Sequence, residues 1–213
     1  FLKSALAPSD RFDPATSTRS FRLLLADPLE PIVLPPILRA IQSSGTISIE
    51  LVPPQSGQVE DLLAENAIDL AVFLKPNQDR SYLTEFVGSL EVVLVGRAGH
   101  PGLGKVPFPQ LVQSFGFAAL NLSAARLKNS EKVNVQTRLL KRDVVLVHRV
   151  SSIPQLLAET DLLAFIPRQF AEDVAPRYGL QIVTPPVPIG EQPMHMIWHK
   201  RNAEDQGISW LRD

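Results

Sequence analysis

The chain has no cysteine among its 213 residues. This absence excludes disulfide bonds, thiolate nucleophiles and cysteine-ligated zinc sites. The chain also lacks an excess of charge of either sign, because the formal net charge is -1 and no segment is strongly basic. DNA binding requires many phosphates to be neutralised by lysine and arginine, so we expect no direct nucleic-acid contact from this polypeptide.

Long apolar runs are missing as well. No run reaches the roughly 20 residues that span a bilayer, and residues 1–20 lack the apolar region of a signal peptide. We therefore expect no membrane association, no export and a cytoplasmic location. The sequence begins with Phe1 and not with methionine, so we expect it to be either a fragment or a processed product of a longer protein.

Motifs for catalysis, cofactors and metals are absent. The sequence has no G-x-S-x-G, Walker A or G-x-G-x-x-G pattern. Of the histidines, His195 and His199 stand four residues apart in a β-like run, where the two side chains are too distant to share one ion. We predict no enzyme, no metal and no cofactor. A small hydrolase or isomerase that pairs His148 with Asp27 is the weakest alternative.

The residues that are present indicate a globular α/β protein. Hydrophobic residues make up 45% and charged residues 20% of the chain, whose length suits one large domain or two small lobes. In the first part, apolar runs predict strands at 21–26, 47–52 and 70–74, and helical spacing predicts helices at 34–41 and 59–66. This β-α-β-α-β order predicts a parallel sheet covered by helices.

A β-rich stretch at 82–95 and a glycine-rich turn lead to a second alternation. Its predicted helices are 108–114, 133–140, 153–159 and 169–177, and its predicted strands are 117–120, 144–150, 162–166 and 180–184. After a proline-rich linker come a strand at 194–199 and a short helix. We expect residues 21–95 with 188–213 to form lobe I, and residues 96–187 to form lobe II. Two crossings would join the lobes, and a cleft between them is the expected ligand site.

The stretch FRLLLADPLEPIVLPPILRAI at 21–41 carries the strongest candidate site. Its turn from Asp27 to Glu30 links a strand to a helix, with Pro31 at the first helical position. The free N–H groups of a helix start favour an anion, although Asp27 and Glu30 compete for that position and Asp27 also suits simple N-capping. Pro35 and Pro36 predict a bend or a late start of this helix.

Other candidates follow the ends of predicted strands. An ordinary capped loop, a core position or a solvated arginine is the alternative interpretation of each one. In chain order they are Gln55 with Ser56, Phe73, Asn121 with Ser123, His148 with Arg149, Ser151 and Ser152, and Phe165 with Ile166 and Pro167.

Several motifs together resemble a known family. They are FDPATSTRSFRLLLAD at 12–27, VLPPIL at 33–38, GQVEDLLAENAIDLAVF at 57–73, RAGHP at 97–101, TDLLAFIPRQFA at 160–171 and MIWHKRNAEDQGISWLRD at 196–213. In this order and spacing, the chain resembles the effector-binding domain of LysR-type transcriptional regulators. It is most similar to the branch of aromatic-degradation and nodulation regulators.

The resemblance implies a periplasmic-binding-protein-like (type 2) fold with two α/β lobes. It also implies a DNA-binding winged helix-turn-helix domain that is absent from this chain, and a linker region whose end is residues 1–20. It further implies a homodimer or homotetramer, and a small-molecule effector in the inter-lobe cleft that alters the oligomer. Aromatic acids, flavonoid-like phenols and other small metabolites are the candidate effectors. A solute-binding protein of a transport system is the alternative with the same fold.

The resemblance assigns most of the candidate residues to the effector pocket. Many members hold an effector carboxylate with serine or threonine at the first helix start, whereas this chain has Asp27 and Glu30 there, which argues against a simple monoanionic ligand. The predicted ligand-binding residues are Asp27, Pro28, Leu29, Gln55, Phe73, Asn121, His148, Phe165, Ile166 and Pro167.

Overall fold

The computed structural model describes residues 12–42, 46–53, 59–74, 79–120, 143–186 and 191–213. These residues form two compact units. Unit 1 takes the described residues within Phe1–Leu25, Val33–Val87 and His195–Asp213, and unit 2 takes those within Ala26–Ile32 and Gly88–Met194. Each unit is thus assembled from segments far apart in the sequence. The lobe boundaries expected after residues 95 and 187 stay predictions.

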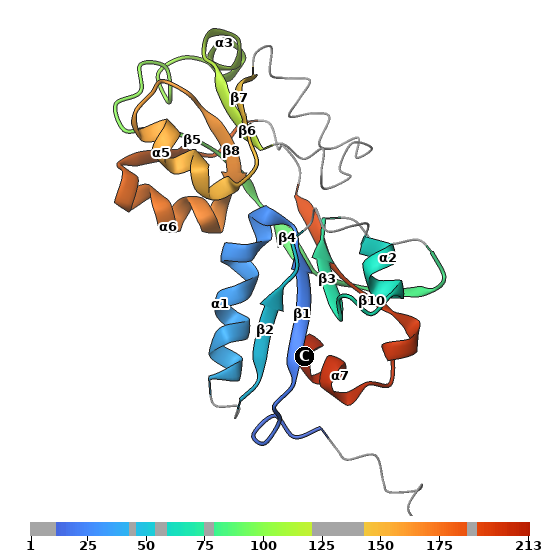
Figure 1. The fold of residues 1–213 in the computed structure, drawn as a ribbon. Coiled ribbons are helices and arrows are strands. Elements are labelled where there is room, and N and C mark those ends of the chain that lie inside the picture. The colour runs from blue at the N-terminus through green and yellow to red at the C-terminus, as the bar shows by residue number, and fades with distance from the viewer. Residues whose placement is uncertain (1–11, 43–45, 54–58, 75–78, 121–142, 187–190) are drawn as a thin grey trace, which may run out of the picture. The chain divides into compact units, whose positions relative to one another are not determined.

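A five-stranded sheet in the order β2-β1-β3-β10-β4 forms the base of unit 1 (Figure 1). β1 pairs in parallel with β2 and β3, and β10 runs antiparallel to β3. The first three predicted strands and their parallel pairing are therefore confirmed. The strands of this sheet are β1 (Ser20–Leu25), β2 (Ser48–Leu51), β3 (Leu70–Phe73), β4 (Tyr82–Leu90) and β10 (Gln192–His199).

Helices pack on both faces of this sheet. Leu63 of α2 (Val59–Ala64) packs in one core cluster with Leu24 of β1. Phe21 projects to the other face, because it stands an odd number of residues from Leu24 in the same strand. There its ring centroid lies 6.1 Å from that of Trp210 in α7 (Gln206–Arg212). The buried alternation of β1 thus organises two layers of helix around one sheet.

The end of α2 corrects one prediction. Asn66, expected to lie within the helix, has a left-handed φ of 56° and ends it. The amides of Asn66 and Ala67 donate to the carbonyls of Leu63 and Leu62, at 3.3 and 2.8 Å. The guanidinium of Arg201 donates to the Leu63 carbonyl as well, at 3.1 Å. The carbonyls of the last turn are therefore paired, and the helix stops early.

The helix α1 (Glu30–Ile41) follows a short 3-10 turn, η1 (Asp27–Leu29). The late start expected from the prolines is wrong, because the helix already begins at Glu30 and continues through Pro35 and Pro36. Each proline lacks an N–H, which costs the helix one hydrogen bond. The proline-rich sequence is nevertheless helical from the corner onward.

Unit 2 repeats the strand order of unit 1. β5 (Val92–Arg97) lies between β8 (Ala164–Pro167) and β9 (Leu180–Val183), antiparallel to both. β6 (Phe117–Leu120) pairs in parallel with β7 (Asp143–Val147), and a bridge from Phe117 to Leu163 connects β6 to the start of β8. The order β7-β6-β8-β5-β9 therefore matches β2-β1-β3-β10-β4. The predicted strand 144–150 ends earlier, at Val147.

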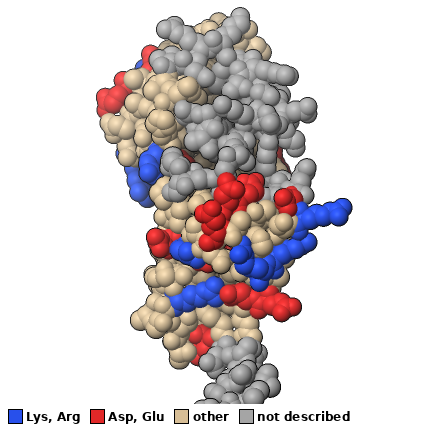
Figure 2. Space-filling model, turned by 45° about the vertical axis from the view of Figure 1, so that its right-hand side comes forward, with Lys and Arg blue, Asp and Glu red and all other residues tan. Residues whose placement is uncertain are grey.

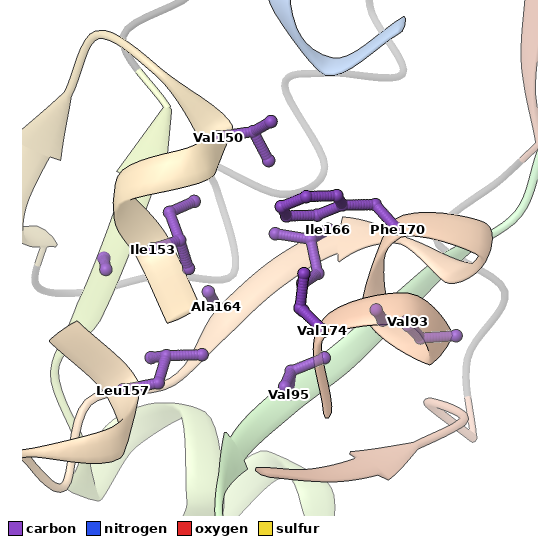
Figure 3. Packing of buried hydrophobic residues seen from close by; sticks show 11 residues of the cluster. Val93, Val95, Val150, Ile153, Leu157, Ala164, Ile166, Phe170 and Val174 are labelled. Atoms are coloured by element: carbon purple, nitrogen blue, oxygen red, sulfur yellow. The ribbon is translucent and has the colours of Figure 1, made fainter. Parts of the chain in front are cut away.

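The helices of unit 2 cover β5 on both faces. They are α3 (Phe108–Ser114), α5 (Ile153–Ala158) and α6 (Arg168–Tyr178), and a 3-10 turn, η4 (Val150–Ser152), precedes α5. Figure 3 shows Val93 and Val95 of β5 with Val174 of α6 and Leu157 of α5 in one buried cluster. Leu94 points to the other face, where it packs in a second cluster under α3. The helix predicted at 133–140 lies outside the described residues.

A fully buried histidine shapes the loop after β5. The Nδ1 atom of His100 accepts hydrogen bonds from the amides of Gly102 and Leu103, at 3.0 and 2.9 Å. Its Nε2 atom lies 3.1 Å from the Asp161 carbonyl and must donate there, because a carbonyl only accepts. His100 thus holds the glycine-rich loop to the turn before β8, as a neutral ring with its proton on Nε2.

Basic and acidic side chains are interspersed on the described surface shown in Figure 2, without a broad field of one sign. This distribution agrees with the small net charge of -1. Within the described part of the chain, every helix is too short or too polar to cross a bilayer.

The contacts of His100 predict a large loss of stability when the ring is removed. His100→Ala leaves two buried amides and one carbonyl without their partner, so unfolding in urea should show a loss of about 2–4 kcal/mol. His148→Ala is the control, because His148 is exposed. A loss in His100→Ala no larger than that of the control would contradict this role.

Candidate functional site

The candidate site is the corner between β1 and α1. Pro28 and Leu29 are buried, Leu29 completely, whereas Asp27 and Glu30 are only partly buried. The apolar pair anchors the turn, and the two carboxylates remain near the surface. This arrangement follows from the sequence DPLE, in which apolar residues stand between two acidic ones.

Within unit 2, a backbone amide binds the carboxylate of Asp27. Its Oδ2 atom accepts a hydrogen bond from the N–H of Val150, at 2.6 Å. Val150 is the first residue of η4, and the side chain of the N-cap residue Arg149 makes no capping hydrogen bond among the described residues. Asp27 therefore does the capping from a distant part of the chain, and its negative charge suits the partial positive charge of a helical start.

The second carboxylate of the corner, that of Glu30, has a shifted pKa. The pKa of Glu30 is raised above its ordinary value, first because burial penalises the charged form and second because Asp27 repels it. The positive charge of Arg149 opposes this shift. The corner thus contains one carboxylate that is bound to an amide and another that resists ionisation, beside an arginine.

The structure brings four of the predicted residues into this region. Asp27, Pro28 and Leu29 form the turn, and the hydrogen bond to Val150 places it beside the exposed segment of His148 and Arg149. Sequence reasoning missed the Val150 amide, because a backbone donor leaves no signal in the residue type. Among the described residues, no group of three or more His, Asp or Glu side chains could hold a metal ion.

Other predicted residues have packing contacts that the sequence did not reveal. Ile166 is 1% exposed and belongs to the core cluster of Figure 3, and Pro167 is buried at the start of α6. The ring of Phe165 stacks on that of Phe117, with centroids 5.6 Å apart. Phe73 is partly buried at the end of β3, in unit 1. Gln55 and Asn121, with Ser56 and Ser123, lie outside the described residues.

A comparison with protein families decides the identity. The model of the LysR substrate binding domain matches residues 15–213. The chain belongs to this family.

Individual relatives of this LysR domain agree with the family match. NagR, an HTH-type transcriptional activator of Ralstonia sp, is 29% identical over 99% of this chain and 70% of that protein. Nodulation protein D 1 of a Bradyrhizobium strain is 25% identical over 99% of this chain and 68% of that protein. The solved regulatory domain of MexT, a transcriptional activator in Pseudomonas aeruginosa, is 26% identical, with a TM-score of 0.74 over 93% of this chain and 96% of that one.

These matches confirm the predicted family and the periplasmic-binding-protein-like α/β fold. The chain is the effector-binding domain of a LysR-type transcriptional regulator. This family is not enzymatic, so the prediction that the chain is no enzyme is confirmed too. The solute-binding and hydrolase or isomerase alternatives are set aside by the same match.

The raised pKa of Glu30 predicts how stability depends on pH. A raised pKa in the folded state gives stability that is present at acidic pH and is lost as pH rises through the folded pKa. Glu30→Gln removes this loss, so its stability relative to the natural chain should increase as pH rises above 4.5, the ordinary pKa of a glutamate, in urea unfolding.

Glu91→Gln provides the matched control with the opposite sign. The pKa of Glu91 is lowered, chiefly by its hydrogen bond with Arg168. Its contribution is therefore present at neutral pH and is lost as pH falls. Relative to the natural chain, Glu91→Gln should become less stable as pH rises. The same trend in both variants would contradict the environment described for Glu30.

Proposed function

We propose that the β1–α1 corner is part of the effector site of this LysR domain. The observation that carries the proposal is the hydrogen bond between Asp27 and Val150, which holds two predicted ligand-binding segments side by side. Asp27, Pro28, Leu29 and His148 are the residues that we propose for ligand contact there. Gln55, Phe73, Asn121, Phe165, Ile166 and Pro167 stay predicted members of the site.

The charges of the corner favour an effector that donates hydrogen bonds. Asp27 and Glu30 supply acceptors, and a carboxylate ligand would be repelled by them. We propose aromatic compounds with hydroxyl groups as the first class to test, because the sequence resembles the branch of aromatic-degradation and nodulation regulators. An effector changes the regulator only through unequal affinity for two conformations.

The corner proposal predicts the outcome of a thermal-shift screen. Aromatic acids, phenols and common metabolites are tested on the 213-residue chain. A true effector should raise the unfolding midpoint in a saturable way, because binding at 100 times Kd stabilises the folded state by about 2.7 kcal/mol. His148→Ala should weaken the shift, whereas Arg177→Ala, a change of an exposed side chain on α6, should leave it unchanged. An identical shift in His148→Ala would contradict an effector site at the corner.

We also propose that the domain forms a homodimer, or a homotetramer, through α1. All residues of α1 are described, and none of them is buried although the helix is rich in Val, Leu, Ile and Pro. Leu38 is 45% exposed. An apolar helix left in water favours association with another apolar surface, and a second copy provides one. The regulator would then contact promoter DNA through a helix-turn-helix domain outside this chain, in the cytoplasm.

The dimer proposal predicts a selective effect of charge on α1. Leu38→Glu should shift the chain toward the monomer in sedimentation velocity, because association would bury the new carboxylate. Leu146→Glu on β7 is the matched control, since Leu146 is also exposed, at 55%. Equal effects of the two changes, or a natural chain that is monomeric at every concentration, would contradict an interface at α1.

A further inference from the structure

Three flat side chains lie in a row across one face of the sheet in unit 1. His195 of β10 stands directly opposite Phe73 of β3. The ring centroid of Phe86, on the neighbouring strand β4, lies 5.8 Å from that of His195 with an interplanar angle of 67°. Directly paired residues of adjacent strands project to the same face, so Phe73, His195 and Phe86 form one row. We call it the aromatic row.

The aromatic row lies on the same face of the sheet as a buried core cluster and extends from that cluster to the surface. Two residues along β10, Ile197 pairs with Ala71, and both are buried in the core cluster beneath α2. In the row itself, Phe73 and His195 are partly buried, and Phe86 is 59% exposed. A single exposed apolar residue is ordinary, but an exposed aromatic ring that extends an apolar face is typical of a binding surface.

His195 supplies a second, independent observation. Its Nδ1 atom is buried and has no hydrogen-bond partner in the described structure. Burial also lowers the pKa of His195, which favours the neutral ring. His100 and His199 differ, since the Nδ1 atom of His100 accepts from two amides and that of His199 accepts from the Arg201 amide. An unpaired buried nitrogen is costly, so a ligand that pairs with it would gain affinity.

The aromatic neighbour of this imidazole is mostly exposed. The Phe86 ring packs edge-to-face on His195 but is mostly in solvent, so it can change rotamer without leaving a core. A planar ring that enters beside Phe86 would keep the aromatic contact and reach the imidazole.

The hydrogen-bonding capacity of the imidazole indicates which class of ligand can pair with it. A neutral imidazole nitrogen is either an acceptor or a donor, depending on the tautomer. A phenolic hydroxyl serves both cases because it can donate and accept, whereas a carboxylate can only accept. We propose that the aromatic row binds the ring of a phenol, with its hydroxyl hydrogen-bonded to Nδ1 of His195. This inference goes beyond the proposed function, because the aromatic row belongs to unit 1 and the proposed corner belongs to unit 2.

Titration with phenol tests the aromatic row directly. Binding is followed through the histidine ¹H–¹⁵N signals of the 213-residue chain, with toluene as a ligand of the same shape that lacks the hydroxyl. Phenol should shift the His195 signals in a saturable way and bind more tightly than toluene. Phe86→Ala should weaken phenol binding about tenfold. Tyr178→Ala, which removes a partly exposed ring from α6, should have no effect.

The hydrogen bond is tested by changing His195. His195→Phe keeps a ring in the row and should abolish the preference for phenol over toluene, and His195→Gln, which restores a polar group, should recover part of it. No saturable phenol binding, or binding that Phe86→Ala and both His195 variants leave unchanged, would overturn the proposal. If phenol fails to bind while a screening hit still depends on His148, the aromatic row is overturned and the proposed sensor function stands.

Discussion

One hydrogen bond, from the Val150 amide to the Asp27 carboxylate, fixes the candidate site. It joins residues 123 positions apart over 2.6 Å. The donor is part of the backbone, so its place depends on η4 and α5, and through Ile153 and Leu157 on the core of unit 2. The geometry of an acidic surface corner is therefore set by apolar packing beneath it. The same bond occupies the carboxylate of Asp27, while burial and the charge of Asp27 raise the pKa of Glu30.

Local patterns predicted most of the strands and helices. Apolar runs bounded by proline or polar residues located β1, β2 and β3 within about two residues, because such runs can be buried only as strands in a covered sheet. The errors arose where backbone conformation overrides the pattern. Asn66 ends α2 through a left-handed φ, and the first turn of α1 forms despite the prolines that follow. Neither outcome is encoded in hydrophobic spacing.

Residues of the candidate site could be predicted from the sequence only where a candidate side chain lies at the end of a predicted strand. Asp27 and His148 satisfy that condition, and the Val150 amide joins their segments. Ile166 satisfies it too, yet strand alternation turns its side chain into the core. The aromatic row could not be predicted from the sequence, because Phe86 and His195 meet across two strands that are more than a hundred residues apart in the chain. Pairing of that kind depends on the whole sheet and not on either local sequence.

The place of β10 in the sheet has a consequence for biosynthesis. β10 spans Gln192–His199, yet it lies between β3, which ends at Phe73, and β4. A ribosome releases the chain from its N-terminus, so more than a hundred residues are made after β4 before the strand between β3 and β4 is available. Until then the edge of β3 presents unpaired N–H and C=O groups to other polypeptides. The nascent chain therefore presents an edge that favours aggregation at β3, and unit 1 closes only after β10 has been synthesised.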